Sequence, residues 1–221
     1  MRQQPSRTTP PPITPNDDLY ILNASPCTAA FDFDGTFIKG DSMTPYLQLM
    51  YRRRDILRSI YHLRRVLRDY QLRRVARKEA KEDILTHFFG GRSMEELHHY
   101  GSRLAREVLP QRVRPKALRR LRWHQAQGHR CLLITASMSF WTTAFAEEYG
   151  LELIATRPLV EDGTFTGRID GPNNYGPEKV RRLEAHLSAE AMGYLYAYGD
   201  TDGDRELLER ADEGLFRPFH E

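Results

Sequence analysis

The sequence predicts an α/β fold in which a mostly parallel sheet carries a long α-helical insertion after its first strand. Short apolar runs, each suited to one buried strand, alternate along the chain with patterns typical of helices. Several of these runs end in acidic or hydroxyl side chains. A stretch between the first and second runs, 34–129, is too long for a simple crossover, so we expect it to contain an inserted cap.

The first predicted strand is Cys27–Phe33, an apolar run that ends in acid and is followed by the turn residue Gly35. From about 44 to 127 the pattern is mostly helical, because apolar residues recur at intervals of three and four. Ser93 and Glu96 have the spacing of a capping box, which predicts a helix start. The clearest apolar repeat is formed by Ile56, Ile60, Leu63, Leu67 and Tyr70.

The rest of the chain alternates strand and helix patterns. Arg130–Thr135 is a second buried strand, and Asp162-Gly163 predicts a hairpin within 159–169. Pro177 is a favoured first-turn residue and predicts a helix start. The other predicted elements are the helix Phe140–Tyr149, the strands Leu151–Thr156 and Tyr194–Tyr198, the helix Arg205–Ala211 and the strand Gly214–Arg217.

The composition is typical of a soluble globular protein. Of 221 residues, 40% are hydrophobic and 29% charged, and no apolar run approaches the roughly 20 residues of a membrane span. Segment 1–18 is proline-rich without the apolar core of a secretory signal, so we expect a disordered leader. Cys27 and Cys131 lie in apolar runs, which favours free thiols in a reducing cytoplasm and leaves a disulfide between them as the alternative.

Positive charge is concentrated in segment 52–78, although the formal net charge of the chain is only +3. The segment contains eleven Lys or Arg against Asp55 and Asp69. It can be a solvated helix face, which we favour, an anion-attracting lid, or a peripheral surface for an anionic membrane. No recognised nucleic-acid motif is present, so no nucleic-acid partner is expected.

Two acidic clusters directly follow predicted strands. Asp32-Phe33-Asp34 closes the first strand, and neighbouring carboxylates repel unless a cation or proton neutralises one of them. Such a pair suits a nucleophile beside a proton donor. The second cluster, 199–204 (GDTDGD), presents oxygen ligands of the kind that a hard cation prefers. A surface turn and a capped helix start are the structural alternatives.

A hydroxyl strand end and a lysine complete the set. Thr135-Ala136-Ser137 follows a predicted strand, where a hydroxyl and free backbone N–H groups suit a phosphate or simply cap a helix. Lys179 falls in the first turn of the helix that begins near Pro177. A lysine there opposes the helix dipole, which indicates a local anion, with a solvated lysine as the alternative.

In this order the motifs resemble those of the haloacid dehalogenase (HAD) superfamily, which are DxDx[TV], a Ser or Thr closing the second strand, a Lys, and an acidic pair such as GDxxxD. The resemblance implies a Rossmann-like, HAD-like core. It also implies a phosphatase, because dehalogenases of this superfamily lack an acid at the position of Asp34. The matching residues span most of the chain: Asp32, Asp34, Thr36, Thr135, Lys179, Asp200 and Asp204.

The same resemblance implies a role for each residue. Asp32 would attack phosphorus and form an aspartyl-phosphate, with Asp34 as general acid and base. Lys179 would offset charge between Asp32 and the phosphoryl group. The implied Mg²⁺ ligands are Asp32, the backbone carbonyl of Asp34, Asp200 and Asp204, the last directly or through water. The implied phosphate-binding residues are Gly35, Thr135, Ala136, Ser137 and Lys179.

The helical insertion between the first two motifs resembles the phosphoserine-phosphatase-like branch (subfamily IB), which carries a helical cap. Asp41 stands where phosphoserine phosphatases typically carry a substrate-recognising Glu, and Gly35 replaces a frequent Ser. Both departures argue against phosphoserine itself. Segment 40–43 (GDSM) is more similar to bacterial members of the branch, some of which are phosphatidylglycerophosphate phosphatases.

The resulting prediction is a cytoplasmic, Mg²⁺-dependent phosphomonoester hydrolase acting on a small phosphorylated substrate, with peripheral contact at the inner membrane face through 52–78 as an option. The alternatives are a phosphatidylglycerophosphate-type lipid phosphatase, a phosphotransferase with the same intermediate, and a catalytically silent protein that binds anions or membranes. The predicted domains are the leader 1–18, a HAD-like core of 19–40 and 128–221, and a helical cap, 41–127.

Overall fold

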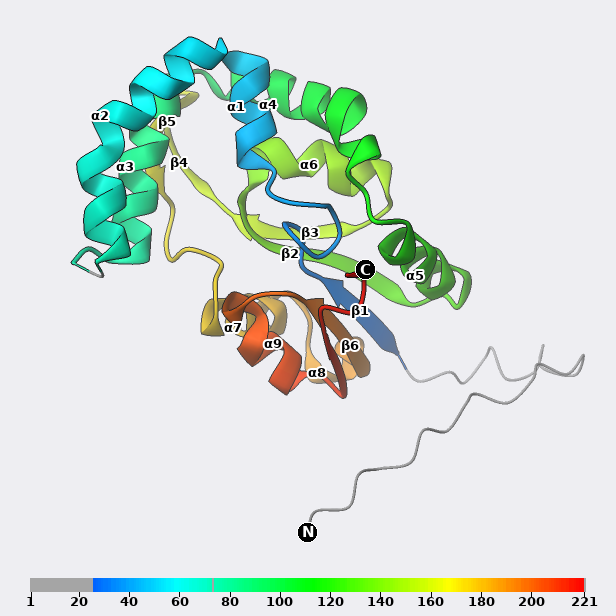
Figure 1. The fold of residues 1–221 in the computed structure, drawn as a ribbon. Coiled ribbons are helices and arrows are strands. Elements are labelled where there is room, and N and C mark those ends of the chain that lie inside the picture. Colours follow the sequence, from blue (N-terminus) through cyan, green and yellow to red (C-terminus); the bar gives the residue numbers. More distant parts are fainter. Residues whose placement is uncertain (1–25, 73, 221) are drawn as a thin grey trace, which may run out of the picture.

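A five-stranded parallel sheet forms the centre of the computed structural model, which describes residues 26–72 and 74–220. The strand order is β3-β2-β1-β6-β7, with helices on both sides (Figure 1). This arrangement confirms the predicted α/β class, whereas the leader predicted for 1–18 lies outside the described residues. The strands are β1 (Cys27–Phe31), β2 (Arg130–Met138), β3 (Glu152–Thr156), β6 (Tyr194–Gly199) and β7 (Glu213–Phe216).

Strand β1 occupies the middle of the sheet because Ala29, Ala30 and Phe31 bury apolar side chains on both of its faces, as a buried parallel strand requires. Its last residue, Phe31, pairs in register with Leu133 of β2 and with Tyr198 of β6. The rings of Phe31 and Tyr198 stack with their centroids 4.6 Å apart. The loops that follow β1 and β6 therefore leave the sheet side by side at one edge.

The described residues of the inserted segment form five α-helices. Gly90-Gly91 separates the third from the fourth, and a π-turn and a 3₁₀ turn (104–111) precede the fifth, which starts at Pro115. The predicted cap at Ser93 is present, since its side chain accepts a hydrogen bond from the amide of Glu96. The helices are α1 (Met43–Met50), α2 (Arg53–Gln71), α3 (Arg77–Phe89), α4 (Met94–Arg103) and α5 (Pro115–Ala126).

The predicted hairpin is also present, but it lies apart from the main sheet. Its strands β4 (Pro158–Glu161) and β5 (Thr164–Ile169) are joined by Asp162 and Gly163, which both have positive φ angles. The hairpin packs against α3, and the carbonyl of Gly163 accepts a hydrogen bond from the amide of Met94 at the start of α4 (Figure 1). The last helices are α6 (Ser139–Glu148), α7 (Pro177–His186), α8 (Ala189–Met192) and α9 (Arg205–Arg210).

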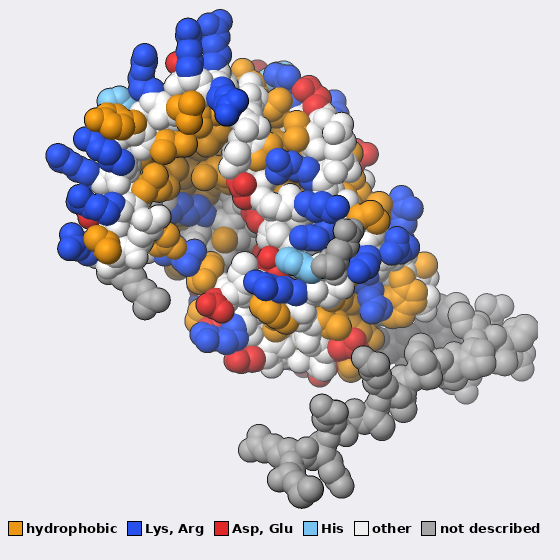
Figure 2. All heavy atoms as spheres, in the orientation of Figure 1, with side chains coloured by type: hydrophobic (Ala, Val, Ile, Leu, Met, Phe, Trp, Pro, Cys, Tyr) orange, Lys and Arg blue, Asp and Glu red, His pale blue; other side chains and the backbone are white. Residues whose placement is uncertain are grey.

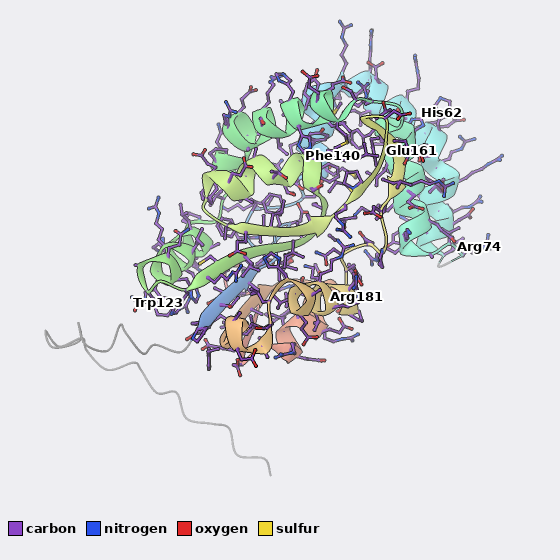
Figure 3. The ribbon with its side chains drawn as sticks, turned by 180° about the vertical axis from the view of Figure 1, so that it is seen from behind. His62, Arg74, Trp123, Phe140, Glu161 and Arg181 are labelled. Carbon is purple, nitrogen blue, oxygen red and sulfur yellow. The ribbon has the colours of Figure 1, made fainter. Side chains whose placement is uncertain are left out.

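An aromatic cluster joins the inserted helices to the helix that covers the sheet. Tyr46 of α1 contacts Trp141 of α6 with ring centroids 5.3 Å apart, and Phe89 of α3 contacts Phe140 at 6.0 Å. Phe140 lies at this junction in the view from behind (Figure 3). Helix α5, in contrast, packs against β2 of the sheet. The division into a core and a cap spanning 41–127 stays a prediction.

The core assignment predicts an unequal response to two leucine truncations. Leu133 in β2 is fully buried, so Leu133→Ala is expected to lower the free energy of unfolding by about 2–5 kcal/mol. Leu57 on α2 is 58% exposed, so Leu57→Ala is expected to change it by less than about 0.5 kcal/mol. Urea unfolding of both variants is the measurement, and equal losses would contradict the assignment.

Candidate active site

Three carboxylates gather at the edge of the sheet where β1 and β6 end. Asp32 directly follows β1, Asp200 follows β6, and Asp204 lies one turn further along, ahead of α9. One oxygen of each lies within 4.8 Å of the others, and all three residues are buried. Carboxylates this close repel strongly in a buried environment, so the site needs positive charge.

Lys179, near the start of α7, supplies one such charge. Its side chain is 2% exposed, and its ammonium nitrogen lies 2.6 Å from Oδ1 of Asp32 and 2.5 Å from Oδ1 of Asp204. Burial alone would lower the pKa of Lys179, but the two carboxylates outweigh it and raise this pKa above its usual value. The two acids are therefore the local anion that the unusual helix position of Lys179 indicated.

The two carboxylates that contact Lys179 differ in their proton affinity. Burial raises the pKa of Asp32 to about 7, against the opposing effect of Lys179. Burial alone would also raise the pKa of Asp204, but Lys179 and nearby backbone donors outweigh this effect and hold the pKa below its usual value. Oδ2 of Asp204 accepts hydrogen bonds from the amides of Asp200 and Thr201 and from the Thr201 hydroxyl. Asp204 therefore holds both the lysine and the loop that carries Asp200.

Gly35 allows the loop after β1 to approach Asp200 closely. Its φ is +81°, and a Cβ at this position would lie 2.3 Å from Oδ2 of Asp200. The next residue, Thr36, donates a hydrogen bond of 3.1 Å from its hydroxyl to Oδ1 of Asp200. The Gly-Thr pair after Asp34 thus joins the two acidic loops.

Asp34 is held at the cavity side of the site by two serines. Its Oδ1 accepts a 2.6 Å hydrogen bond from the amide of Ser42, and its Oδ2 accepts one of 2.5 Å from the hydroxyl of Ser137. Trp141 donates its indole N–H to the Ser42 hydroxyl and fixes that residue in turn. Burial raises the pKa of Asp34, while the serine hydrogen bonds oppose the shift. This carboxyl is therefore suited to carrying a proton.

The predicted hydroxyl segment lies within the irregular end of β2 rather than after it. The pairing of β2 with β3 shifts register between Ile134 and Met138, so the strand continues through Thr135, Ala136 and Ser137. The hydroxyl oxygen of Thr135 accepts a hydrogen bond of 2.9 Å from the amide of Ser137. The Thr135 hydroxyl is the acceptor in this bond, so its own proton can be donated to another group.

Asn174, which the sequence analysis missed, clamps this strand end from the loop before α7. Its side-chain N–H₂ group donates hydrogen bonds to the carbonyls of Thr135 (2.9 Å) and Ile154 (2.8 Å). The residue is fully buried. It therefore couples the hydroxyl segment to β3 and to the loop that leads to Lys179.

Lys81, on α3, is the second residue that the sequence analysis missed. Its ammonium nitrogen donates to the carbonyl of Ala136 at 2.5 Å and to Oδ1 of Asn173 at 2.7 Å. Burial lowers its pKa to about 7; Asp34 opposes this shift, and Arg77 and Arg182 add to it. A group from the inserted helices thus lies beside the predicted proton donor.

A cavity of about 270 Å³ opens between Asp34 and the inserted helices. On this face the surface is hollowed beside α2, and hydrophobic side chains line the hollow (Figure 2). The polar groups at its base are Asp34, Lys81, Ser137 and Asn173. The remaining lining residues are mostly apolar or aromatic: Met43, Tyr70, Arg77, Ala80, Ile84, Leu85, Ala136, Trp141 and Tyr175.

Asp41, the predicted substrate contact, is exposed in this structure. Its Oδ1 accepts a 2.7 Å hydrogen bond from the amide of Thr44, and its backbone carbonyl accepts one of 3.0 Å from Arg112. It does not line the cavity beside Asp34. Its role in substrate recognition stays a prediction, whereas its contact with Thr44 gives it a role at the start of α1.

The donor set fits a divalent cation. Asp32, Asp200 and Asp204 present carboxylate oxygens close enough to share one ion, and hard cations such as Mg²⁺ prefer oxygen ligands. Lys179 brings one positive charge against three carboxylates, so a cation would compensate the remainder. Both oxygens of Asp204 already accept hydrogen bonds, which leaves Asp32 and Asp200 as the more available ligands.

Comparisons with known sequences and structures identify similar proteins over most of the chain. The family model described as haloacid dehalogenase-like hydrolase matches residues 29–209. The chain is 31% identical over 200 residues to protein CicA of Caulobacter vibrioides, covering 90% of this chain and 89% of that protein. Among solved structures, a protein of unknown function from Bordetella pertussis superposes with a TM-score of 0.73 at 29% identity, covering 84% of this chain and 87% of that one.

A more distant structure shares the fold. A substrate-bound phosphoserine phosphatase superposes with a TM-score of 0.61 at 15% identity, covering 88% of this chain and 86% of that one. The same sheet and inserted helices therefore recur in a protein with little sequence in common.

The pKa of Lys81 gives a direct test of the geometry around the cavity. Its ammonium is expected to titrate near pH 7, so it is charged below that pH and neutral above it. The side-chain carbon resonances of lysine, followed by NMR over a pH series, measure this. The resonance is assigned by its loss in Lys81→Arg. Absence of any lysine titration near neutrality would contradict the placement of this ammonium against Ala136 and Asn173.

Proposed function

The chain belongs to the haloacid dehalogenase-like hydrolases, and we propose that it is a phosphatase that cleaves phosphate monoesters through Asp32. The family match confirms the resemblance drawn from the motifs. The observation that carries the proposal is the contact of Lys179 with Oδ1 of Asp32, whose carboxylate lies in one buried cluster with Asp200 and Asp204. The catalytically silent alternative is disfavoured because burying three carboxylates around one lysine is costly, and apolar side chains would hold these loops together without that cost.

Asp32 acts as the nucleophile in the proposed mechanism. Its Oδ1 is held by Lys179, while Oδ2 forms a bond to phosphorus as the ester P–O bond breaks. The electron pair of the broken bond leaves with the ester oxygen, which takes a proton from Asp34. The raised pKa of Asp34 supports this role, because it favours the protonated form before the transfer.

The second step returns Asp32 to its starting state. Asp34, now ionised, takes a proton from a water molecule whose oxygen attacks phosphorus, and the bond between phosphorus and Asp32 breaks to release inorganic phosphate. An alcohol in place of water would make the same site a phosphotransferase. The backbone amide of Ser42 and the hydroxyl of Ser137 are positioned to hold Asp34 through both steps.

Binding a dianionic ester beside Asp32 requires positive charge and hydrogen-bond donors. The proposed phosphate-binding residues are Lys179, Thr135 through its hydroxyl, Gly35, Ala136 and Ser137. Asp32, Asp200 and the backbone carbonyl of Asp34 are the proposed Mg²⁺ ligands. We assign Asp204 to a water-mediated contact, because its oxygens are engaged by Lys179 and the loop. Bound Mg²⁺ would supply electrostatic stabilisation of the phosphoryl group.

The leaving group of the substrate would occupy the cavity beside Asp34. The third proton of the Lys81 ammonium, which neither Ala136 nor Asn173 uses, can bind an oxygen of that group. A small phosphorylated compound fits a volume of about 270 Å³. A phosphorylated lipid head group is the second candidate, favoured by the mostly apolar lining. The free thiols of Cys27 and Cys131 support a cytoplasmic location.

Removal of the carboxylate of either Asp32 or Asp200 is expected to abolish phosphatase activity. Asp32→Asn removes the nucleophile and is expected to lower kcat by at least about 10³-fold. Asp200→Asn weakens the proposed cation site, and EDTA is expected to inhibit the unmodified protein. The measurement is phosphate release from p-nitrophenyl phosphate and a panel of phosphorylated metabolites and lipids, with Mg²⁺ or EDTA.

The matched control is Asp202→Asn, which removes an exposed acid from the same loop. It is expected to retain nearly full activity. Equal activity of Asp32→Asn and the unmodified protein would refute the mechanism. Release that is insensitive to EDTA would refute the metal requirement alone.

Lys81→Gln is expected to raise KM with little change in kcat. A hydrogen bond to a charged group contributes about 1.5–3 kcal/mol, so kcat/KM is expected to fall roughly tenfold or more. Lys78→Gln, on the same helix and outside the cavity, is the control. Steady-state kinetics on the best substrate of the panel decides this, and unchanged KM in Lys81→Gln would remove Lys81 from the substrate site.

A further inference from the structure

Helix α2 exposes apolar side chains that a helix packed only for stability would bury. Eight large hydrophobic residues are strongly exposed among those the structure describes, and four of them fall between 57 and 72. The exposed fractions are 58% for Leu57, 45% for Ile60, 63% for Tyr61 and 54% for Leu72. Such a concentration of apolar surface in one segment is typical of an interaction site.

Arginines surround these apolar side chains. We call the exposed surface formed by Leu57, Ile60, Tyr61 and the neighbouring arginines the α2 face. Its guanidinium groups extend away from the molecule (Figures 2 and 3), and the two acids of the helix, Asp55 and Asp69, are each paired with an adjacent arginine. The arginines are Arg53, Arg54, Arg58, Arg64, Arg65 and Arg68, all exposed.

The α2 face is not needed to hold the helix in place. The buried residue of α2 is Leu63, and Ile56, Val66 and Leu67 pack partly against the same core. These residues face α1 and α3, the helices that α2 contacts most. Arg64 stacks over Tyr61, with its guanidinium carbon 4.1 Å from the ring centroid. This cation–π contact holds a cationic and an aromatic group side by side on the exposed surface.

The combination of cationic and apolar groups on one surface specifies the partner. An anionic bilayer offers phosphate groups to the arginines and an apolar boundary to Leu57, Ile60 and Tyr61, and tyrosine favours that interface. A nucleic acid would use the arginines and leave exposed aliphatic side chains without a partner. In the described part of the chain no helix is long and apolar enough to span a membrane, so the contact would be peripheral.

We propose that the α2 face docks on an anionic lipid bilayer. Tyr70 of α2 and Arg77 of α3 line the cavity beside Asp34, so the same helix borders both the docking surface and the proposed substrate site. Docking would place a helix that borders the cavity at the lipid head groups. The docking itself does not depend on the proposed catalysis.

Vesicle co-sedimentation of the full chain tests the proposal. The vesicles contain phosphatidylcholine alone or mixed with phosphatidylglycerol, and binding is expected only to the anionic mixture. Each basic residue near an anionic surface contributes about 1 kcal/mol, so the double variant Arg58→Gln/Arg65→Gln is expected to bind at least about tenfold more weakly. Leu57→Ser/Tyr61→Ser is expected to weaken binding as well, because the apolar contact is lost.

The matched control is Arg119→Gln/Arg122→Gln, which removes the same charge from exposed positions of α5. It is expected to bind like the unmodified chain, and thermal unfolding verifies that each variant is folded. Equal losses in both arginine variants would overturn the proposal, since net charge rather than the α2 face would then be responsible. Binding to neither vesicle, or tighter binding to a short DNA duplex that the α2 variants abolish, would also overturn it.

Discussion

The buried ammonium of Lys179 is the interaction on which the site depends. It contacts Asp32 and Asp204 at once, although these residues follow different strands. Without this charge, the carboxylates that close β1 and β6 would repel one another inside the protein. Removing one member of such a buried pair is costly because it leaves an uncompensated charge. The ion pairs therefore hold two loops and the start of α7 in one arrangement.

Other contacts position the loops and strand ends around this ion pair. Gly35 allows the first acidic loop to touch Asp200, and Asn174 fixes the end of β2 against β3. Asp34, two residues after Asp32, is held next to the cavity by the Ser42 amide and the Ser137 hydroxyl. The carboxyl that would exchange a proton therefore lies close to the charge cluster that would receive a phosphate, as the proposed two-step transfer requires.

The inserted helices contribute to two different surfaces. On the inner side, Lys81 reaches the end of β2 and helps to form a largely apolar cavity. On the outer side, α2 presents arginines among exposed apolar residues. The inserted helices border both surfaces, so the α2 face and the cavity lie on the same part of the molecule. The sequence could suggest the basic segment but not this adjacency, since helix periodicity does not fix which face meets the core.

The sequence alone determined the strand and helix order, the parallel sheet and the acidic loops at Asp32 and Asp200, because local apolar periodicity and strand-end position encode these features. It did not reveal Lys81 or Asn174. A lysine in a charged helical stretch such as 77–83 is indistinguishable from solvated neighbours, and an Asn pair before Pro177 is typical of a turn. Only tertiary packing decided their roles, because burial and contacts between residues distant in the chain depend on how α3 and the loop before α7 lie against the sheet edge.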